Sequence, residues 1–177
     1  QPDSDSGPEF GWSVALSADG DTAVVGAMQD SVDGNDRQGT ATVFTRSGGT
    51  WTEQQTIRHS NDAEYGQFGS SVALSADGDI AIVGVPYHVD WTANAIGAAT
   101  VFTRTGGTWT EKQIIAPGDS EATGRFGMSV ALSAYGGTAI VGATLWPSDG
   151  RGIIKNGGVV VRGGKIVFAG PMGDLPA

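Results

Sequence analysis

The segment FGWSVALSADGDTAVVGA, residues 10–27, occurs three times in this chain with small changes. It returns as FGSSVALSADGDIAIVGV from Phe68 and as FGMSVALSAYGGTAIVGA from Phe126, so successive copies begin 58 residues apart. A second block keeps this step: VFTR at 43–46 recurs at 101–104, and GGTWTE at 48–53 recurs at 106–111. A fixed period of this length indicates an architecture in which each repeat forms one supersecondary unit.

Each repeat carries the pattern of four short strands, predicted in the first repeat at 13–17, 22–26, 40–46 and 50–57. Asp19-Gly20 predicts a two-residue turn between the first two strands, because Gly adopts a positive φ freely and Asp tolerates one. Gly48-Gly49 predicts the turn between the last two. The first two strands are built of small and branched apolar residues, which is typical of strands covered on both faces. The fourth strand is largely polar, which favours an edge in contact with solvent.

These patterns predict an all-β fold of β-propeller type with three four-stranded antiparallel blades. Blade 1 is assigned to residues 1–58, blade 2 to 59–116 and blade 3 to 117–177. Blade 3 diverges from about residue 151, where VFTR and GGTWTE are missing, yet 159–162 and 165–169 still predict a hairpin. A divergent terminal unit is expected of a repeat array, because its outer face has no neighbour.

Three blades are fewer than the roughly four to eight that close a propeller ring. Three architectures follow: part of a longer propeller, one half of a ring completed by a second chain, or closure of three sheets around a pseudo-threefold axis. Residues 1–9 resemble the connectors before the second and third copies, so we expect the chain to begin inside an inter-repeat connector.

The combination of FGxSVALS, DGDTAVVGA and GTATVFTR resembles the FG-GAP repeat family over about residues 1–146. Repeats of this family form the blades of integrin α-subunit propellers and of many bacterial extracellular and cell-surface proteins. The resemblance implies one propeller blade per repeat, which argues against pseudo-threefold closure. It also implies a binding or adhesive role outside the cytoplasm.

Many members of that family carry an acid-rich calcium loop, D-x-D-x-D-G-x-x-D, between the first two strands. Here the corresponding positions hold only Asp19 and Asp21 in the first copy, Asp77 and Asp79 in the second, and no acid in the third. Calcium takes roughly six to eight oxygen ligands, so we interpret these acids as turn residues. The segment from Ile153 resembles the opening hairpin of the amidohydrolase superfamily over about 25 residues, but lacks the metal-binding His-x-His that follows it there.

Composition excludes several classes of function. The formal charge of −9, the pI of about 4.4 and the scattered basic residues argue against nucleic acid, whose binding requires clustered Lys and Arg. There is no cysteine and only two histidines, so a zinc site is not expected. No apolar run reaches the roughly 20 residues of a membrane span, and the N-terminal residues do not form a signal peptide.

No catalytic residues are predicted. GxSxG is absent, the Ser of FGxSV lies in a predicted strand, and the glycine-rich stretches are hairpin turns without the strand-to-helix setting of phosphate loops. We therefore expect the protein not to be an enzyme.

Two loops carry candidate site residues. The first gathers Asp30, Asp33, Asn35 and Asp36, which is either a calcium-binding loop or a solvated polar loop, the latter being the simpler interpretation. The other candidates, in the corresponding loops of the second and third repeats, are Tyr87, His88, Trp91 and Trp146. They either form a ligand surface or cap the blade core. Trp51 and Trp109, and the three phenylalanines, recur at identical positions and are expected to be structural.

Two functional hypotheses follow. The first is a non-enzymatic extracellular or cell-surface binding or adhesion module of the FG-GAP type, which contacts a protein or glycan through its blade loops. The alternative is a structural repeat segment of a larger secreted enzyme or surface protein. No cofactor is expected except calcium, and the partners considered are a protein or glycan ligand, a second copy that completes a ring, or further blades of a longer chain.

Overall fold

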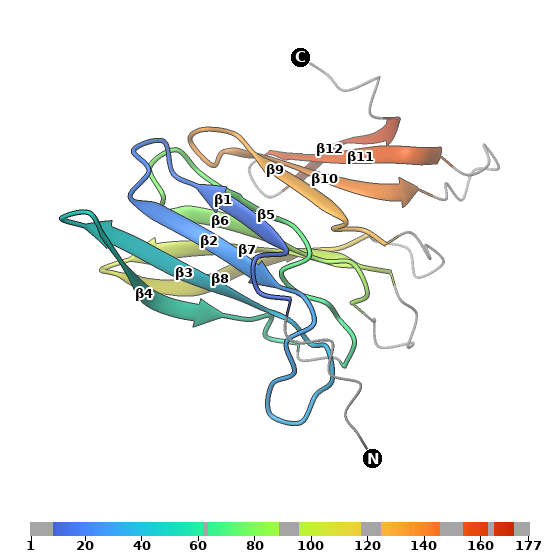
Figure 1. Cartoon of the computed structure of the whole chain (residues 1–177). Coiled ribbons are helices and arrows are strands. Elements are labelled where there is room, and N and C mark those ends of the chain that lie inside the picture. The colour runs from blue at the N-terminus through green and yellow to red at the C-terminus, as the bar shows by residue number, and fades with distance from the viewer. Residues whose placement is uncertain are drawn as a thin grey trace.

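A computed structural model of the chain describes residues 9–61, 64–88, 96–117, 125–145, 154–162 and 165–171. The regular elements of this part are strands, which form three separate four-stranded antiparallel sheets (Figure 1). The predicted all-β fold with four-stranded blades is thereby confirmed. No helix among the described residues is long and apolar enough to cross a membrane.

The three sheets follow the three repeats, and in each the strands are hydrogen-bonded in chain order. Blade 1 contains β1 (Ser13–Leu16), β2 (Thr22–Ala27), β3 (Thr40–Ser47) and β4 (Thr50–Ile57). Blade 2 contains β5 (Val72–Leu74), β6 (Ile80–Val85), β7 (Ala98–Thr105) and β8 (Thr108–Ile115). Blade 3 contains β9 (Ser129–Leu132), β10 (Thr138–Leu145), β11 (Ile154–Arg162) and β12 (Lys165–Pro171).

The divergent end of the chain completes its sheet as expected. β11 pairs with β12 from Gly157–Pro171 to Arg162–Lys165. A register shift follows Val160, as it follows Val43 in blade 1 and Val101 in blade 2. The hairpin therefore keeps the geometry of the third and fourth strands although the sequence of the earlier repeats is lost.

The sheets pack face against face, with the first strands β1, β5 and β9 adjacent to one another (Figure 1). We call the side of a sheet that faces the preceding blade its leading face, and the other side its trailing face. Two apolar cores result. The core between blades 1 and 2 contains Val24, Val43, Phe68, Val83, Phe102 and Trp109, and the core between blades 2 and 3 contains Ile82, Ala99, Ile115, Phe126 and Val141.

The gradient from apolar to polar strands is also confirmed. β2 and β6 are almost wholly buried, whereas most of β4 is exposed to solvent. The expectation that the first strand is covered on both faces is wrong for blade 1, where Val14 and Leu16 are exposed. Their side chains lie on the leading face, which no described segment covers, whereas Val72 and Leu74 in blade 2 pack against the core shared with blade 1.

Blades approach one another closely enough for backbone contact. Ser13 Oγ of blade 1 donates to the carbonyl of Gly69 at 2.7 Å, and Ser71 Oγ of blade 2 donates to the carbonyl of Gly127 at 2.8 Å. The turns are linked as well, because Ala18 N donates to Ala76 O and Ala76 N donates to Ala134 O. Both of these kinds of inter-blade contact are thus repeated after 58 residues.

The first turn of each repeat differs from the predicted two-residue turn. Ser17 N donates to Thr22 O and Gly20 N donates to Ser17 O, so the turn is centred on Ala18 and Asp19 and only Gly20 has a positive φ, of 71°. The reason is the Ser17 side chain, which donates to Asp19 Oδ1 at 2.6 Å and accepts from Thr22 N. A type I turn followed by a left-handed glycine is the longer hairpin connection.

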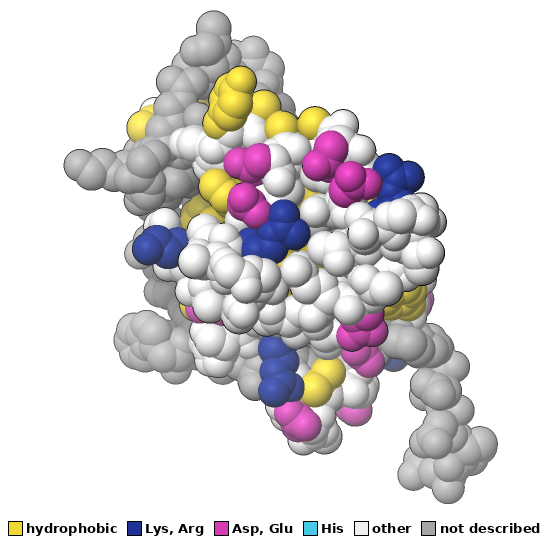
Figure 2. Space-filling model, turned by 90° about the vertical axis from the view of Figure 1, so that its left-hand side faces the viewer, with side chains coloured by type: hydrophobic (Ala, Val, Ile, Leu, Met, Phe, Trp, Pro, Cys, Tyr) yellow, Lys and Arg dark blue, Asp and Glu magenta, His cyan; other side chains and the backbone are white. Residues whose placement is uncertain are grey.

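The acids of these turns have defined partners. Asp21 forms an ion pair with Arg46 at 2.9 Å, and Asp79 forms one with Arg104 at 2.7 Å. Figure 2 views the end of the sheets at which these turns lie and shows acidic side chains beside basic ones. The hydroxyl of Ser75, 2.5 Å from Asp77, and the backbone N–H of Asp79 lower the pKa of Asp77 below its ordinary value of 3.8.

This lowered pKa predicts a small acid-sensitive contribution to stability. Because the pKa of Asp77 is lower in the folded protein, its stabilising effect is complete above pH 3.8 and is lost as the pH falls through the folded value. Asp77→Asn is therefore expected to lower the unfolding temperature slightly near neutral pH, with a gap to the parent protein that closes in acid. Thermal unfolding followed by circular dichroism across the acid range measures the gap. The same substitution in a Ser75→Ala background serves as control, and an equally large gap there would contradict the assigned cause.

Candidate functional site

The loops that follow the second strands meet the inter-blade connectors at one end of the molecule, which we call the loop end. Backbone hydrogen bonds join Tyr65 N to Asp36 O at 2.7 Å and Gln67 N to Arg37 O at 3.1 Å, so the connector lies along the β2–β3 loop. Tyr87 N then donates to Gly66 O at 3.2 Å, which places the β6–β7 loop on the other side of the same connector. Blades 1 and 2 therefore share a continuous loop surface.

Several residues of the loop end have a left-handed backbone. Glu9, Gln67 and Arg125 have φ values of 49°, 56° and 46°, and each immediately precedes the FG pair of its repeat. Because this conformation recurs in every copy, it belongs to the repeat and carries no functional inference. It does fix the direction in which the side chain before FG leaves the connector.

Tyr87 and Arg125 form the contact between blades 2 and 3 on this surface. The guanidinium carbon of Arg125 lies 5.1 Å from the centroid of the Tyr87 ring. Tyr87 is half-buried and Arg125 is exposed, so the pair presents an aromatic ring and a cation to solvent. A stacked guanidinium holds the ring in place and retains donors for a ligand. The sequence pointed to Tyr87 but not to Arg125, whose only signal is its place directly before FG.

His88 lies beneath this surface and not on it. Its side chain is buried, and its ring meets the buried ring of His59 edge to face at a centroid distance of 4.8 Å. His59 Nδ1 lies 2.8 Å from Thr100 Oγ1, and Glu111 Oε2 lies 4.0 Å from the same nitrogen. The histidine pair thus connects the connector, the β6–β7 loop and β7. Sequence analysis did not predict the burial of His59.

The acidic loop of blade 1 distributes its carboxylates over separate partners. Asp30 Oδ2 accepts from Thr40 Oγ1 at 2.8 Å, and Asp33 Oδ2 pairs with Arg58 Nη1 at 2.7 Å. Asn35 forms a backbone bridge with Val32, and Asp36 accepts from a connector amide through its carbonyl. Among the described residues no group of three or more His, Cys, Asp or Glu side chains is placed to hold a metal ion. Calcium at this loop stays a prediction from sequence.

The remaining two predicted site residues, Trp91 and Trp146, lie outside the described residues. Of the four aromatic candidates, the described structure therefore places Tyr87 at the surface and His88 in the interior. Trp109 has the structural role expected of it, because its ring is buried between blades 1 and 2. Trp51, at the same position of blade 1, is exposed.

Comparison with solved structures identifies distant likenesses in fold. The periplasmic gluconolactonase PpgL of Pseudomonas aeruginosa is similar with a TM-score of 0.55 and 18% identity, over 85% of this chain and 38% of that protein. The GH74 enzyme of Niastella koreensis is similar with a TM-score of 0.49 and 18% identity, over 83% of this chain and 21% of that protein. The chain thus spans well under half the length of either structure. At this identity the gluconolactonase likeness concerns the fold alone.

A search of curated proteins found no match to this chain. Family comparison, in contrast, matches the FG-GAP repeat over residues 1–44, 51–102 and 109–159, which is most of the sequence. Each matched stretch contains one copy of the FG segment, with the first two strands and part of the third strand of one sheet. The second and third stretches also include most of the fourth strand of the preceding sheet. The chain forms three blades of propeller type, and it belongs to the FG-GAP repeat family.

Proposed function

We propose that this chain is a non-enzymatic binding segment of an extracellular or cell-surface propeller, and that it contacts its ligand through the loop end. The ligand is a protein or a glycan. Membership of the FG-GAP family supports a repeat segment of this kind and a place outside the cytoplasm. Loops carried by a rigid β scaffold are a frequent location for binding residues, because the scaffold fixes their positions.

The observation that carries the proposal is the pair of Tyr87 and Arg125. Tyr and Arg are enriched in the centres of protein interfaces, where a large ring and a planar cation supply contact area and directed hydrogen bonds. Here the two side chains come from different blades and meet at 5.1 Å from guanidinium carbon to ring centroid. Tyr65, which is half-exposed on the connector joined to both loops, extends the same surface.

A second candidate function is a structural repeat segment without a ligand of its own. It is favoured by the burial of His88 and by the internal partners of Asp30 and Asp33, because these sequence candidates are used to hold the loop end together. In this case the loops serve packing between blades, and the functional centre lies in other parts of a larger protein.

Binding measurements on two variants distinguish the candidates. Tyr87→Ala and Arg125→Ala are each expected to weaken binding about tenfold or more, as removal of central interface residues does. The purified chain and its variants are tested against immobilised extracellular-matrix proteins and an array of defined oligosaccharides. Surface plasmon resonance then gives the affinity for each component that binds saturably.

Tyr135→Ala is the matched control, because Tyr135 is an exposed tyrosine in the β9–β10 turn at the opposite end of the sheets. Its substitution is expected to leave binding unchanged. Saturable binding that is insensitive to Tyr87→Ala and Arg125→Ala would rule out the loop end as the binding site. Absence of saturable binding to either panel would favour the structural segment.

A further inference from the structure

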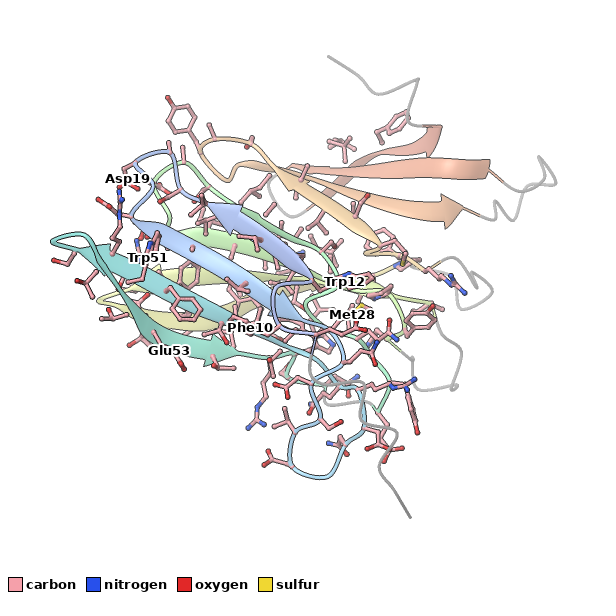
Figure 3. The ribbon with its side chains drawn as sticks, in the orientation of Figure 1. Phe10, Trp12, Asp19, Met28, Trp51 and Glu53 are labelled. Carbon is pink, nitrogen blue, oxygen red and sulfur yellow. The ribbon has the colours of Figure 1, made fainter. Side chains whose placement is uncertain are left out.

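The leading face of blade 1 exposes a row of large apolar side chains. Phe10, Val14, Leu16 and Trp51 are 57%, 58%, 57% and 42% exposed. Figure 3 shows Phe10 over the sheet and Trp51 near the hairpin turns, so members of the row lie at different points along the blade. Large apolar areas of this kind on soluble proteins mark interaction sites.

The next blade shows what this face looks like when it is covered. Phe68 and Trp109, 58 residues after Phe10 and Trp51, are 0% and 3% exposed. The residue types, strand positions and local ring pairs are the same, since Phe10 meets Phe44 at 6.1 Å and Phe68 meets Phe102 at 5.8 Å between ring centroids. Phe68 and Trp109 are buried because the trailing face of blade 1 covers them. No described segment covers Phe10 and Trp51 in this way.

The covering face has a defined chemistry. Gly26 and Gly39 lack the Cβ atoms that would overlap the backbone of Gly69 and Phe68, so the backbones of the two blades approach closely. The amide group of Gln55 accepts from Trp109 N at 2.9 Å and donates to Trp109 O at 3.0 Å. Gln54 Oε1 accepts from the indole N–H of that tryptophan at 3.0 Å. Two glycines and two glutamines thus recognise the FG segment and the tryptophan of the next leading face.

A second copy of this chain does not offer the same face. The copy would have to dock through the trailing face of blade 3, where Gly142 occupies the position of Gly26. Val43 and Val160 are equivalent, because each directly precedes the register shift of its third strand. The residue that pairs with Val43 is Gln55, whereas the residue that pairs with Val160 is Phe168. A phenylalanine has no amide to pair with the backbone of Trp51. The chemistry therefore selects a blade of the type of blade 1.

We propose that the leading face of blade 1 is the interface for one further FG-GAP blade, whose trailing face carries glycines at the positions of Gly26 and Gly39 and glutamines at those of Gln54 and Gln55. The interface is separate from the loop-end surface at Tyr87 and Arg125. The blade interface can therefore be tested whether or not a ligand binds at the loop end.

The absence of cysteine from the chain permits a direct test by thiol labelling. Phe10→Cys is prepared in the full chain and in an extended chain that carries a second copy of residues 10–67 directly before position 10. The added blade is expected to slow maleimide labelling of this cysteine about tenfold or more, because labelling of a buried site requires local opening. Tyr135→Cys, at the distant turn, is the control and is expected to react at the same rate in both chains.

Three further results decide the proposal. Replacement of the two copied glutamines by alanine in the added blade is expected to restore faster labelling, since the tryptophan contacts are lost. Equal labelling of Phe10→Cys in the original and in the folded extended chain would overturn the proposal. Labelling of the original chain that slows with protein concentration, together with a dimer in light scattering, would show that a second copy covers the face and would overturn it as well.

The extended chain is first checked for cooperative unfolding by circular dichroism. If residues 10–67 do not fold in the added position, residues 68–125 are used as the added blade. Their trailing face already covers blade 3 through Gly84 and Gly97 and carries Gln113 in the place of Gln55. Lys112, which stands at the position of Gln54, is replaced by glutamine in this added blade, so that both glutamine positions are filled. Unchanged labelling with this second extension would equally overturn the proposal.

Discussion

Gly84→Ala is expected to destabilise the protein by about 3 kcal/mol, because the site has no space for the methyl group of alanine. A Cβ atom on Gly84 would overlap the backbone carbonyl of Gly127 and the hydroxyl of Ser71. The φ angle of Gly84 is not in the left-handed region, so the cost comes from the contact between blades and not from backbone preference. Gly26→Ala, which meets the carbonyl of Gly69 in the same way, is expected to cost a similar amount.

Two other glycines provide matched controls for this prediction. Gly142 occupies the corresponding position of blade 3, but a Cβ there would meet mainly the side chain of Ser129, which can rotate away. Gly142→Ala is therefore expected to cost about 1 kcal/mol. Gly137 has open space around it and no positive φ, so Gly137→Ala is expected to change stability by less than about 0.5 kcal/mol.

Urea unfolding followed by circular dichroism measures all four variants, with the midpoint and slope compared together. The decisive comparison is between Gly84 and Gly142, because both lie in second strands at the same repeat position. If Gly142→Ala costs as much as Gly84→Ala, the loss reflects glycine in a strand and not the approach of two blades.

The strands of this fold are predictable from sequence because their signals are local. Apolar runs of four to eight residues end at Gly- and Asp-containing turns, and β2, predicted at 22–26, was placed without reference to any distant contact. The Gly48-Gly49 turn joins Ser47 to Thr50 as a two-residue hairpin, as predicted. The Asp19-Gly20 turn was misplaced because the Ser17 hydroxyl, through its bonds to Asp19 and to Thr22 N, decides which residues lie at its centre.

Burial is less predictable, because identical local sequences have different neighbours. Trp51 and Trp109 stand in the same GGTWTE block, yet one ring is exposed and the other is hydrogen-bonded to Gln54 between blades. The loop end is harder still. Tyr87 and Arg125 are remote in sequence and meet only because the connector before blade 3 returns past the β6–β7 loop. The residue before FG and the aromatic residue of the preceding loop form a recognisable pair only when the blades are stacked.

Phe68→Ala is expected to cost about 4 kcal/mol, whereas Phe10→Ala is expected to cost less than about 1 kcal/mol. The two residues occupy the same position of the repeat, and each contacts the equivalent phenylalanine of its own blade, Phe44 or Phe102. Phe68, however, is fully buried in the core shared by blades 1 and 2, so its removal leaves a cavity as well as losing apolar burial. Phe10 is 57% exposed, and removal of its ring leaves a gap that water fills.

Phe126→Ala completes this series, since Phe126 is as buried as Phe68 but faces the trailing side of blade 2. Its cost is expected to match that of Phe68→Ala, with urea midpoints as the measurement. A large loss for Phe10→Ala in the original chain would mean that its ring is already covered in solution. In the chain extended by residues 10–67, by contrast, Phe10→Ala should approach the cost of Phe68→Ala, because the added trailing face turns an exposed ring into a core residue. The same side chain would then contribute little or much to stability according to the blade beside it.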